Sequence, residues 1–146
     1  MSRMAARRTP DNAVTYGNEP DLPVDAFIDV LRRSTLASRR PVGDRTRIAR
    51  MLAHADITLC ARDAQGVLVG VSRALTDYAY CCYLSDLAVD RAWQGAGIGR
   101  ELIRRTHEIA GPQSMLLLLS APAAMTYYPH VGMTKSENAF IVPRQS

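Results

Sequence analysis

The segment Gln94-Gly95-Ala96-Gly97-Ile98-Gly99-Arg100 places three glycines at alternate positions between a strand-like run and a helix-like run. Glycine has no Cβ, so its backbone can take a positive φ and approach a ligand closely, with successive N–H groups pointing at phosphate oxygens. A helix that begins directly after such a loop adds free N–H groups and the positive end of its dipole. The segment therefore predicts an anion-binding loop.

The sequence on either side of the glycines supports this reading. Residues 80–89 are rich in the apolar and aromatic side chains that favour a strand. Apolar residues recur at helical spacing over residues 98–110, and Gly111-Pro112 ends that helix. The predicted loop thus lies at the carboxyl end of a strand and opens a helix.

Two common phosphate-binding motifs do not fit the loop. A dinucleotide site needs Gly-x-Gly-x-x-Gly and an acidic residue about 20 positions later, whereas residues 116–119 are all leucine. A Walker loop needs Gly-Lys-Ser/Thr, and Lys135 is the chain's only lysine. A glycine-rich turn without a ligand stays open as the alternative at this point.

Two motifs resemble those of the GNAT superfamily of N-acetyltransferases. Residues 94–99 are similar to its Gln/Arg-x-x-Gly-x-Gly/Ala signature, and Leu-Ser-Asp-Leu-Ala-Val at 84–89 is similar to its central strand. Tyr-Tyr-Pro-His-Val-Gly-Met at 127–133 resembles its aromatic-Tyr-x-x-x-Gly-Phe segment, with Met133 where the family usually has Phe. The resemblance covers roughly residues 12–143.

The resemblance implies a mixed α/β (α+β) fold. Its sheet would be twisted and mostly antiparallel, with helices on both faces and a splay after the central strand. The hydrophobic pattern predicts matching elements in this order: strand 13–16, helix 23–33, a helix from 44, strands 57–62 and 67–75, strand 115–120, helix 121–130 and strand 140–142. The apolar run 115–120 predicts a strand buried on both faces, and strand 140–142 would pair with 133–136.

Composition indicates one globular domain. The chain has 146 residues, 47% hydrophobic and 22% charged, which fits a single domain over 12–146 with a flexible tail over 1–11. No apolar run reaches the ~20 residues that span a bilayer, and the N-terminus lacks the apolar part of a signal peptide. We therefore expect a cytoplasmic protein with no membrane partner; a homodimer stays open.

The charged residues and cysteines exclude other classes of ligand. The net charge of +4 is carried by dispersed arginines, without a nucleic-acid-binding motif, so we expect no nucleic acid partner. An anionic ligand would still profit from the excess. Three cysteines, two of them adjacent, fit a reducing compartment and offer no zinc spacing, so no metal is expected.

On the resemblance, the co-substrate is acetyl-coenzyme A. The backbone N–H of Val89 would polarise the acetyl carbonyl, and the backbone of Leu87 would contact the pantetheine arm. The pyrophosphate would lie on the backbone of the loop, which comprises Gln94, Gly95, Ala96, Gly97, Ile98, Gly99 and Arg100.

Two residues are candidates for acid–base chemistry. Tyr128 aligns with the family's tyrosine that protonates the departing thiolate, and a phenol with a pKa of about 10 is protonated at neutral pH. A buried tyrosine with a satisfied hydroxyl is the alternative. Asp86 is the carboxylate of the central strand, but alternation places it opposite Val89 unless a bulge intervenes. It is either a base or substrate anchor, or a structural hydrogen-bonding residue.

The resemblance further implies that the acceptor is a primary amine of a small molecule or peptide. Residues 34–47 and 76–80 would wall its site: arginines of the first segment favour a carboxylate or phosphate, and Asp77, Tyr78 and Tyr80 favour an amine cation. An acceptor with an anionic group and an acceptor that is only a cation both stay open as interpretations. A catalytically inactive acyl-CoA-binding sensor is the second function, since no evident base is present, and an ATP-binding protein is the third.

Overall fold

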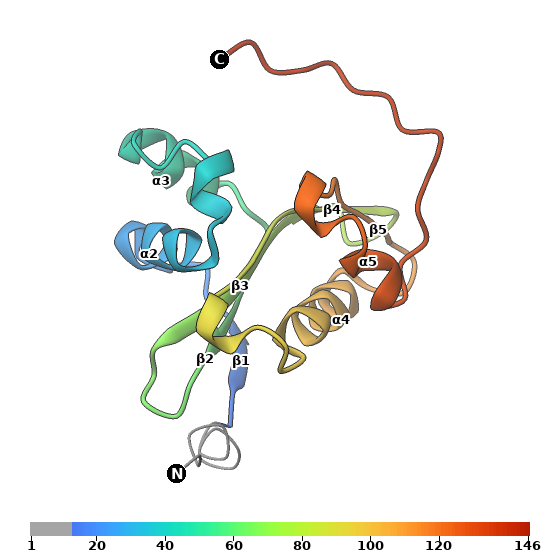
Figure 1. The fold of residues 1–146 in the computed structure, drawn as a ribbon. Helices are drawn as coiled ribbons and strands as arrows, with labels where there is room; N and C mark the ends of the chain where they lie inside the picture. The colour runs from blue at the N-terminus through green and yellow to red at the C-terminus, as the bar shows by residue number, and fades with distance from the viewer. Residues whose placement is uncertain (1–12) are drawn as a thin grey trace.

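The computed structural model describes residues 13–146, so the predicted tail over 1–11 lies outside the described residues. Five strands form one sheet in the order β1-β2-β3-β4-β5, antiparallel from β1 to β4 and parallel between β4 and β5 (Figure 1). The strands are β1 Thr15–Asn18, β2 Ile57–Arg62, β3 Leu68–Thr76, β4 Cys81–Val89 and β5 Met115–Leu117. The mixed, mostly antiparallel sheet that the sequence predicts is confirmed.

Helices cover both faces of this sheet (Figure 1). The α-helices are α2 Val24–Ser34, α3 Arg45–Ala53, α4 Ile98–Ala110 and α5 Tyr127–His130, with 3-10 turns η2 Leu36–Arg39, η3 Arg91–Trp93 and η4 Pro122–Ala124. Helices α2 and α3 pack in one core cluster, and α4 packs in a second cluster on the other face. None of the helices within residues 13–146 has the length and apolarity needed to cross a bilayer.

The two helical layers are held by amphipathic faces. On α2, Phe27, Val30 and Leu31 are fully buried, as the spacing of apolar residues requires. On α4, Leu102 and Thr106 are fully buried against the sheet, where the Thr106 and Ser72 hydroxyls share a hydrogen bond of 2.8 Å. This bond satisfies two buried polar groups and fixes α4 over β3.

A β-bulge interrupts β4 beside the centre of the sheet. Arg73 of β3 lies opposite Asp86, whereas the next residue, Ala74, lies opposite Leu84, so Ser85 is the extra residue. A bulge resets the alternation of side chains. Cys82 accordingly packs in the α4 cluster, whereas Ala88, also at an even position, packs in the α2/α3 cluster.

Strands β4 and β5 pair over only three positions and then separate. Their register ends at Tyr83 opposite Leu117, while β4 continues to Val89. The predicted strand 115–120 is therefore too long, and it is not buried on both faces, since Met115 is 66% exposed. The apolar run indicated burial, but β5 is an edge strand with no neighbour beyond it among the described residues.

The C-terminal segment also departs from the prediction. Residues 133–146 form no strand, and Phe140 and Val142 are almost fully exposed as the chain leads away from β5 (Figure 1). A strand at 140–142 needs a partner with free N–H and C=O groups, and its expected partner, 133–136, is itself irregular. The predicted helix 121–130 is divided into η4 and α5.

Burial separates the three thiols. Cys60 and Cys82 are each 1% exposed, and burial raises the pKa of the Cys60 thiol to about 12, whereas Cys81 is exposed. Because the thiolate is the reactive form, iodoacetamide at pH 8 should modify Cys81 alone in the folded protein and all three cysteines in urea. Peptide mass spectrometry measures this. Rapid modification of Cys60 in the folded protein would contradict the packing.

Candidate functional site

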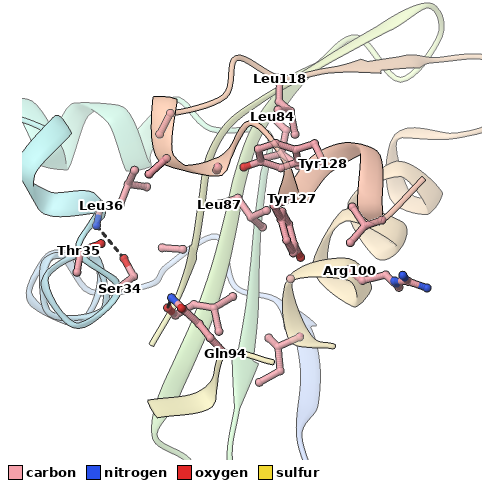
Figure 2. A pocket seen from close by; sticks show the side chains of 18 of the residues that line it. Ser34, Thr35, Leu36, Leu84, Leu87, Gln94, Arg100, Leu118, Tyr127 and Tyr128 are labelled. Atoms are coloured by element: carbon pink, nitrogen blue, oxygen red, sulfur yellow. Dashed lines mark hydrogen bonds between the residues drawn. The ribbon is translucent and has the colours of Figure 1, made fainter. Parts of the chain in front are cut away.

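A cleft of about 1120 Å³ opens where β4 and β5 diverge (Figure 2). Four segments of the chain contribute lining residues, which lie within 34–40, 84–89, 93–100 and 118–131. Pockets for one small molecule are commonly 300–1,000 Å³. The volume of this cleft is sufficient for an extended ligand together with a second, smaller one.

The glycine segment forms one end of the cleft. Gly95 and Gly97 take φ values of 87° and 85°, in the left-handed region that L side chains avoid. Gly97 is the N-cap of α4, and no side chain caps this helix end. The first N–H groups of α4 are thus left to a ligand, as an anion-binding loop requires.

Eight of the nine residues predicted to bind the cofactor line this cleft; Ala96 does not. Within the segment 94–100, Gln94, the three glycines, Ile98 and Arg100 all line this cleft, and α4 begins at Ile98; Figure 2 labels Gln94 and Arg100. The glycine spacing in the sequence thus marks a segment that lines the cleft, and its binding of a cofactor stays a prediction.

The exposed backbone edge of β4 faces the same space. The N–H of Asp90 donates to the carbonyl of Val69 on β3 at 2.8 Å. Since backbone groups of an antiparallel strand alternate in direction, the N–H groups of Val89 and Leu87 point away from β3, toward the cleft. Consistently, the Val89 carbonyl accepts a hydrogen bond from the Gln94 side chain at 3.0 Å. These N–H groups are free to meet a carbonyl oxygen.

Tyr128, on α5, projects into the middle of the cleft. Figure 2 shows its ring beside Leu84, and it packs edge-on against Tyr127 with ring centroids 5.2 Å apart. No residue within 13–146 hydrogen-bonds its hydroxyl, so the alternative of a satisfied core tyrosine is not observed. Burial raises the pKa of the Tyr128 phenol, Tyr127 adds to the rise, and Arg40 opposes it. The hydroxyl is therefore protonated at neutral pH.

Tyr127 links Tyr128 to the glycine loop. Its hydroxyl lies against Gly99 in the first turn of α4, where a Cβ on that residue would overlap it. Gly99 has an ordinary helical φ, so its role is to permit this close approach. Sequence reasoning assigned Gly99 to the phosphate loop and did not find its contact with Tyr127, because the two residues lie in separate segments.

Asp86 does not line the cleft. Its side chain is fully buried, and its two carboxylate oxygens accept from Nε of Arg40 and Nε of Arg73. The bulge at Ser85 does not turn it toward the cleft, which Ser85, Leu84 and other β4 residues line instead. With both oxygens engaged and no exposed surface, Asp86 fits the structural alternative better than the role of base or substrate anchor.

The two arginines connect separate elements through this carboxylate. Arg73 also donates to the carbonyl of Met51 in α3 and to Oγ of Ser85, both at 3.2 Å. Arg40, which follows η2, donates to the carbonyl of Ser85 at 2.7 Å. This Arg40–Asp86–Arg73 cluster therefore ties α3, the segment after α2 and the bulge of β4 together.

The candidate acceptor residues divide into two groups. Asp77, Tyr78 and Tyr80 lie outside the cleft, and Asp77 instead accepts three backbone N–H groups of the β3–β4 turn, which hold its pKa at about 2. Arg39 and Arg40 line the cleft. Arg45 and Arg47 do not line it, so two of the four arginines of segment 34–47 remain candidates for the acceptor site.

Known proteins share this architecture. Residues 24–133 match the model of the acetyltransferase (GNAT) family. A GNAT family acetyltransferase from Streptococcus pneumoniae is 16% identical with a TM-score of 0.67, covering 92% of this chain and all of that one. No curated protein matches the chain.

Two further solved structures contain ligands. An aminoglycoside acetyltransferase from an uncultured soil metagenomic sample, in complex with sisomicin, is 18% identical with a TM-score of 0.68, covering 91% of this chain and 96% of that one. AAC(6')-Iy, in complex with the bisubstrate analogue CoA-S-monomethyl-acetylneamine, is 13% identical with a TM-score of 0.68, covering 92% and 99%. At these identities the likeness concerns the fold.

Removal of the buried carboxylate tests the cluster. Asp86→Ala leaves the buried Arg73 and the partly buried Arg40 without a counter-charge, so we expect the free energy of unfolding to fall by about 3–5 kcal/mol. Asp25→Ala removes the exposed partner of Arg45 and should leave the urea midpoint nearly unchanged. Urea unfolding followed by circular dichroism measures both. Equal midpoints for the two variants would show that the cluster does not stabilise the fold.

Proposed function

We propose that this chain, which belongs to the acetyltransferase (GNAT) family, transfers an acetyl group from acetyl-coenzyme A to a primary amine of a small molecule or peptide. The observation that carries the proposal is the cleft in which three features meet. They are the uncapped start of α4, the free backbone edge of β4 and the unpartnered hydroxyl of Tyr128.

The donor would extend from the glycine loop along β4. The N–H groups of the loop and of the first turn of α4 suit a pyrophosphate, because they combine close approach with the helix dipole. Arg100 lines the cleft at this end and can add a charge-assisted hydrogen bond. The complex of AAC(6')-Iy with a CoA-based bisubstrate analogue supports this placement, since that protein shares the fold.

The reaction would proceed by direct attack. The neutral amine nitrogen forms a bond to the thioester carbonyl carbon, the carbon–sulfur bond breaks, and the sulfur takes the proton of the Tyr128 hydroxyl. The Val89 N–H would bind the carbonyl oxygen as its negative charge develops. The acylated nitrogen loses its extra proton to water, and Tyr128 regains a proton from solvent, so the products are the amide and free coenzyme A.

No carboxylate among the described residues serves as a base in the cleft. Asp86 is enclosed by Arg40 and Arg73. We propose that the amine enters in its neutral form, or that water bound near Ser85 takes the proton. The cationic surroundings favour the neutral amine, since a like charge nearby lowers the pKa of an ammonium group.

An acyl-CoA-binding sensor without turnover is the second candidate, and the lack of a carboxylate base within the described cleft favours it. Free thiol released from acetyl-coenzyme A in the presence of a panel of amines separates the two functions. Cofactor binding without thiol release from any amine would favour the sensor. Thiol release that depends on the amine would establish the transferase.

Replacement of the Tyr128 hydroxyl tests the acid. Tyr128→Phe keeps the ring and its packing, so kcat should fall about 10²–10⁴-fold while the Kd for acetyl-coenzyme A changes little. Tyr16→Phe, at a half-buried tyrosine on β1 outside the cleft, is the matched control and should retain full turnover. Thiol-release kinetics and calorimetric binding give the two quantities. Full turnover by Tyr128→Phe would remove the hydroxyl from the mechanism.

The pH profile tests the same assignment independently. The pKa of the Tyr128 phenol is raised above its ordinary value of 10.0, so the acid stays protonated throughout the neutral and mildly alkaline range. We expect kcat/KM to rise with pH as the amine loses its proton and to show no fall from Tyr128 below about pH 10. A descending limb centred near pH 8 in the pH–rate profile would contradict this role for Tyr128.

A further inference from the structure

The charges on the cleft wall are all of one sign. Among the described residues that line it there is no Asp and no Glu, although the chain contains 14 acidic residues. The basic residues on the wall are Arg39, Arg40, Arg100 and His130. A ligand in this cleft therefore meets guanidinium groups and no carboxylate of the described wall.

These arginines are not equivalent. Arg40 is bonded to Asp86, a carboxylate that it shares with Arg73, so that cluster keeps an uncompensated positive charge. Arg100 lies at the glycine loop, at the end assigned to the donor phosphates, and its side chain donates a hydrogen bond to the His130 carbonyl at 3.4 Å.

Arg39 lies on the opposite wall, at the end of η2. Its guanidinium has no ion pair and no hydrogen bond to any residue within 13–146. The backbone that carries it is held from both sides: Ser38 Oγ donates to the Thr35 carbonyl at 3.1 Å, and Arg40 is bonded to β4. Figure 2 shows Ser34, Thr35 and Leu36 of this wall facing the cleft across from Tyr127.

The wall also carries backbone strain. Thr35 has a φ of 76°, which is costly for a β-branched residue. The hydrogen bond from the Leu36 N–H to Ser34 Oγ, at 3.1 Å, stabilises the turn (Figure 2). The segment from 34 to 39 is thus a fixed wall that presents hydroxyl groups and one unpaired cation.

We infer that the acceptor amine carries an anionic group, a carboxylate or phosphate, which Arg39 binds by charge-assisted hydrogen bonds. This inference rests on the proposed acetyl transfer and names the class of acceptor for that same cleft. The planar guanidinium matches the two oxygens of a carboxylate or phosphate. A polycation would place further ammonium groups beside these arginines, and no carboxylate of the described wall would pair with those ammonium groups. Aminoglycosides are therefore poor acceptors for this chain.

The inference separates this chain from relatives that share its fold. The soil metagenomic enzyme was solved with sisomicin, an aminoglycoside. Discrimination between ligands can come from repulsion as well as attraction. The charged side chains on the described wall of this cleft are arginines. They repel a polycation and attract an anion.

Matched acceptors test the class directly. Glycylglycine and its C-terminal amide differ in one carboxylate, 2-aminoethyl phosphate and 2-methoxyethylamine differ in a phosphate, and sisomicin represents the polycations. Thiol release from acetyl-coenzyme A should give a kcat/KM at least tenfold higher for an anionic acceptor than for its uncharged partner, with sisomicin lowest. The pair with the larger ratio of kcat/KM between its anionic and its uncharged member shows whether the site prefers a carboxylate or a phosphate.

The variant Arg39→Gln tests whether Arg39 binds the anionic group of the acceptor. Arg39→Gln should raise KM for the anionic acceptor about tenfold and leave KM for acetyl-coenzyme A, and for the uncharged partner, unchanged. Arg32→Gln, an exposed arginine of α2 outside the cleft, is the control and should change none of these constants. The thermal midpoints of both variants should equal that of the original chain, because Arg39 makes no described side-chain contact.

The outcomes separate a failure of the acceptor class from a failure of acetyl transfer. Efficient acetylation of sisomicin or of the uncharged amines over the anionic ones would overturn the anionic-acceptor class and leave acetyl transfer intact. An equal rise in KM for charged and uncharged partners in Arg39→Gln would also overturn it. Absence of thiol release with every amine, despite acetyl-coenzyme A binding, would instead refute the proposed transferase and this inference with it.

Discussion

Asp86 lies fully buried between Arg40 and Arg73, and the placement of the cleft depends on this ion-pair cluster. A buried carboxylate is costly unless its oxygens are paired and hydrogen-bonded. The required partners come from β3 and from the segment after η2, and Arg73 also reaches α3. The two layers on this side of the sheet therefore cannot shift relative to the bulge of β4 without leaving a buried charge unpaired.

A second series of contacts fixes the other side of the cleft. Tyr127 packs against Gly99 at the start of α4, and its ring packs against Tyr128. The distance between the glycine loop and the Tyr128 hydroxyl is thereby set by direct packing instead of by the long connection from α4 to α5. The loop that would hold the donor phosphates and the group that would protonate its sulfur are parts of one packed unit, as a reaction with fixed geometry needs.

The sequence predicted the features that depend on local pattern. The glycine segment and the helix after it follow from a short motif and from periodicity, whereas the mostly antiparallel sheet and the position of Tyr128 follow from the family resemblance. The buried position of Asp86 could not be predicted in this way. Its partners Arg40 and Arg73 lie 46 and 13 residues away in the sequence, and an arginine is usually expected to be exposed. Likewise, the leucines after Met115 indicated a buried strand, but burial depends on a neighbouring element that local sequence does not specify.

The sign of the charge in the cleft connects the three requirements of the proposed reaction. A positive wall would attract the donor phosphates, favour a neutral amine over an ammonium, and bind an anionic acceptor. Arg39 is exposed to water, so its contact with the anion is screened and weak compared with a buried pair. An exposed arginine at this position would thus select the acceptor by charge and still allow the acetylated product, which keeps the anion, to leave.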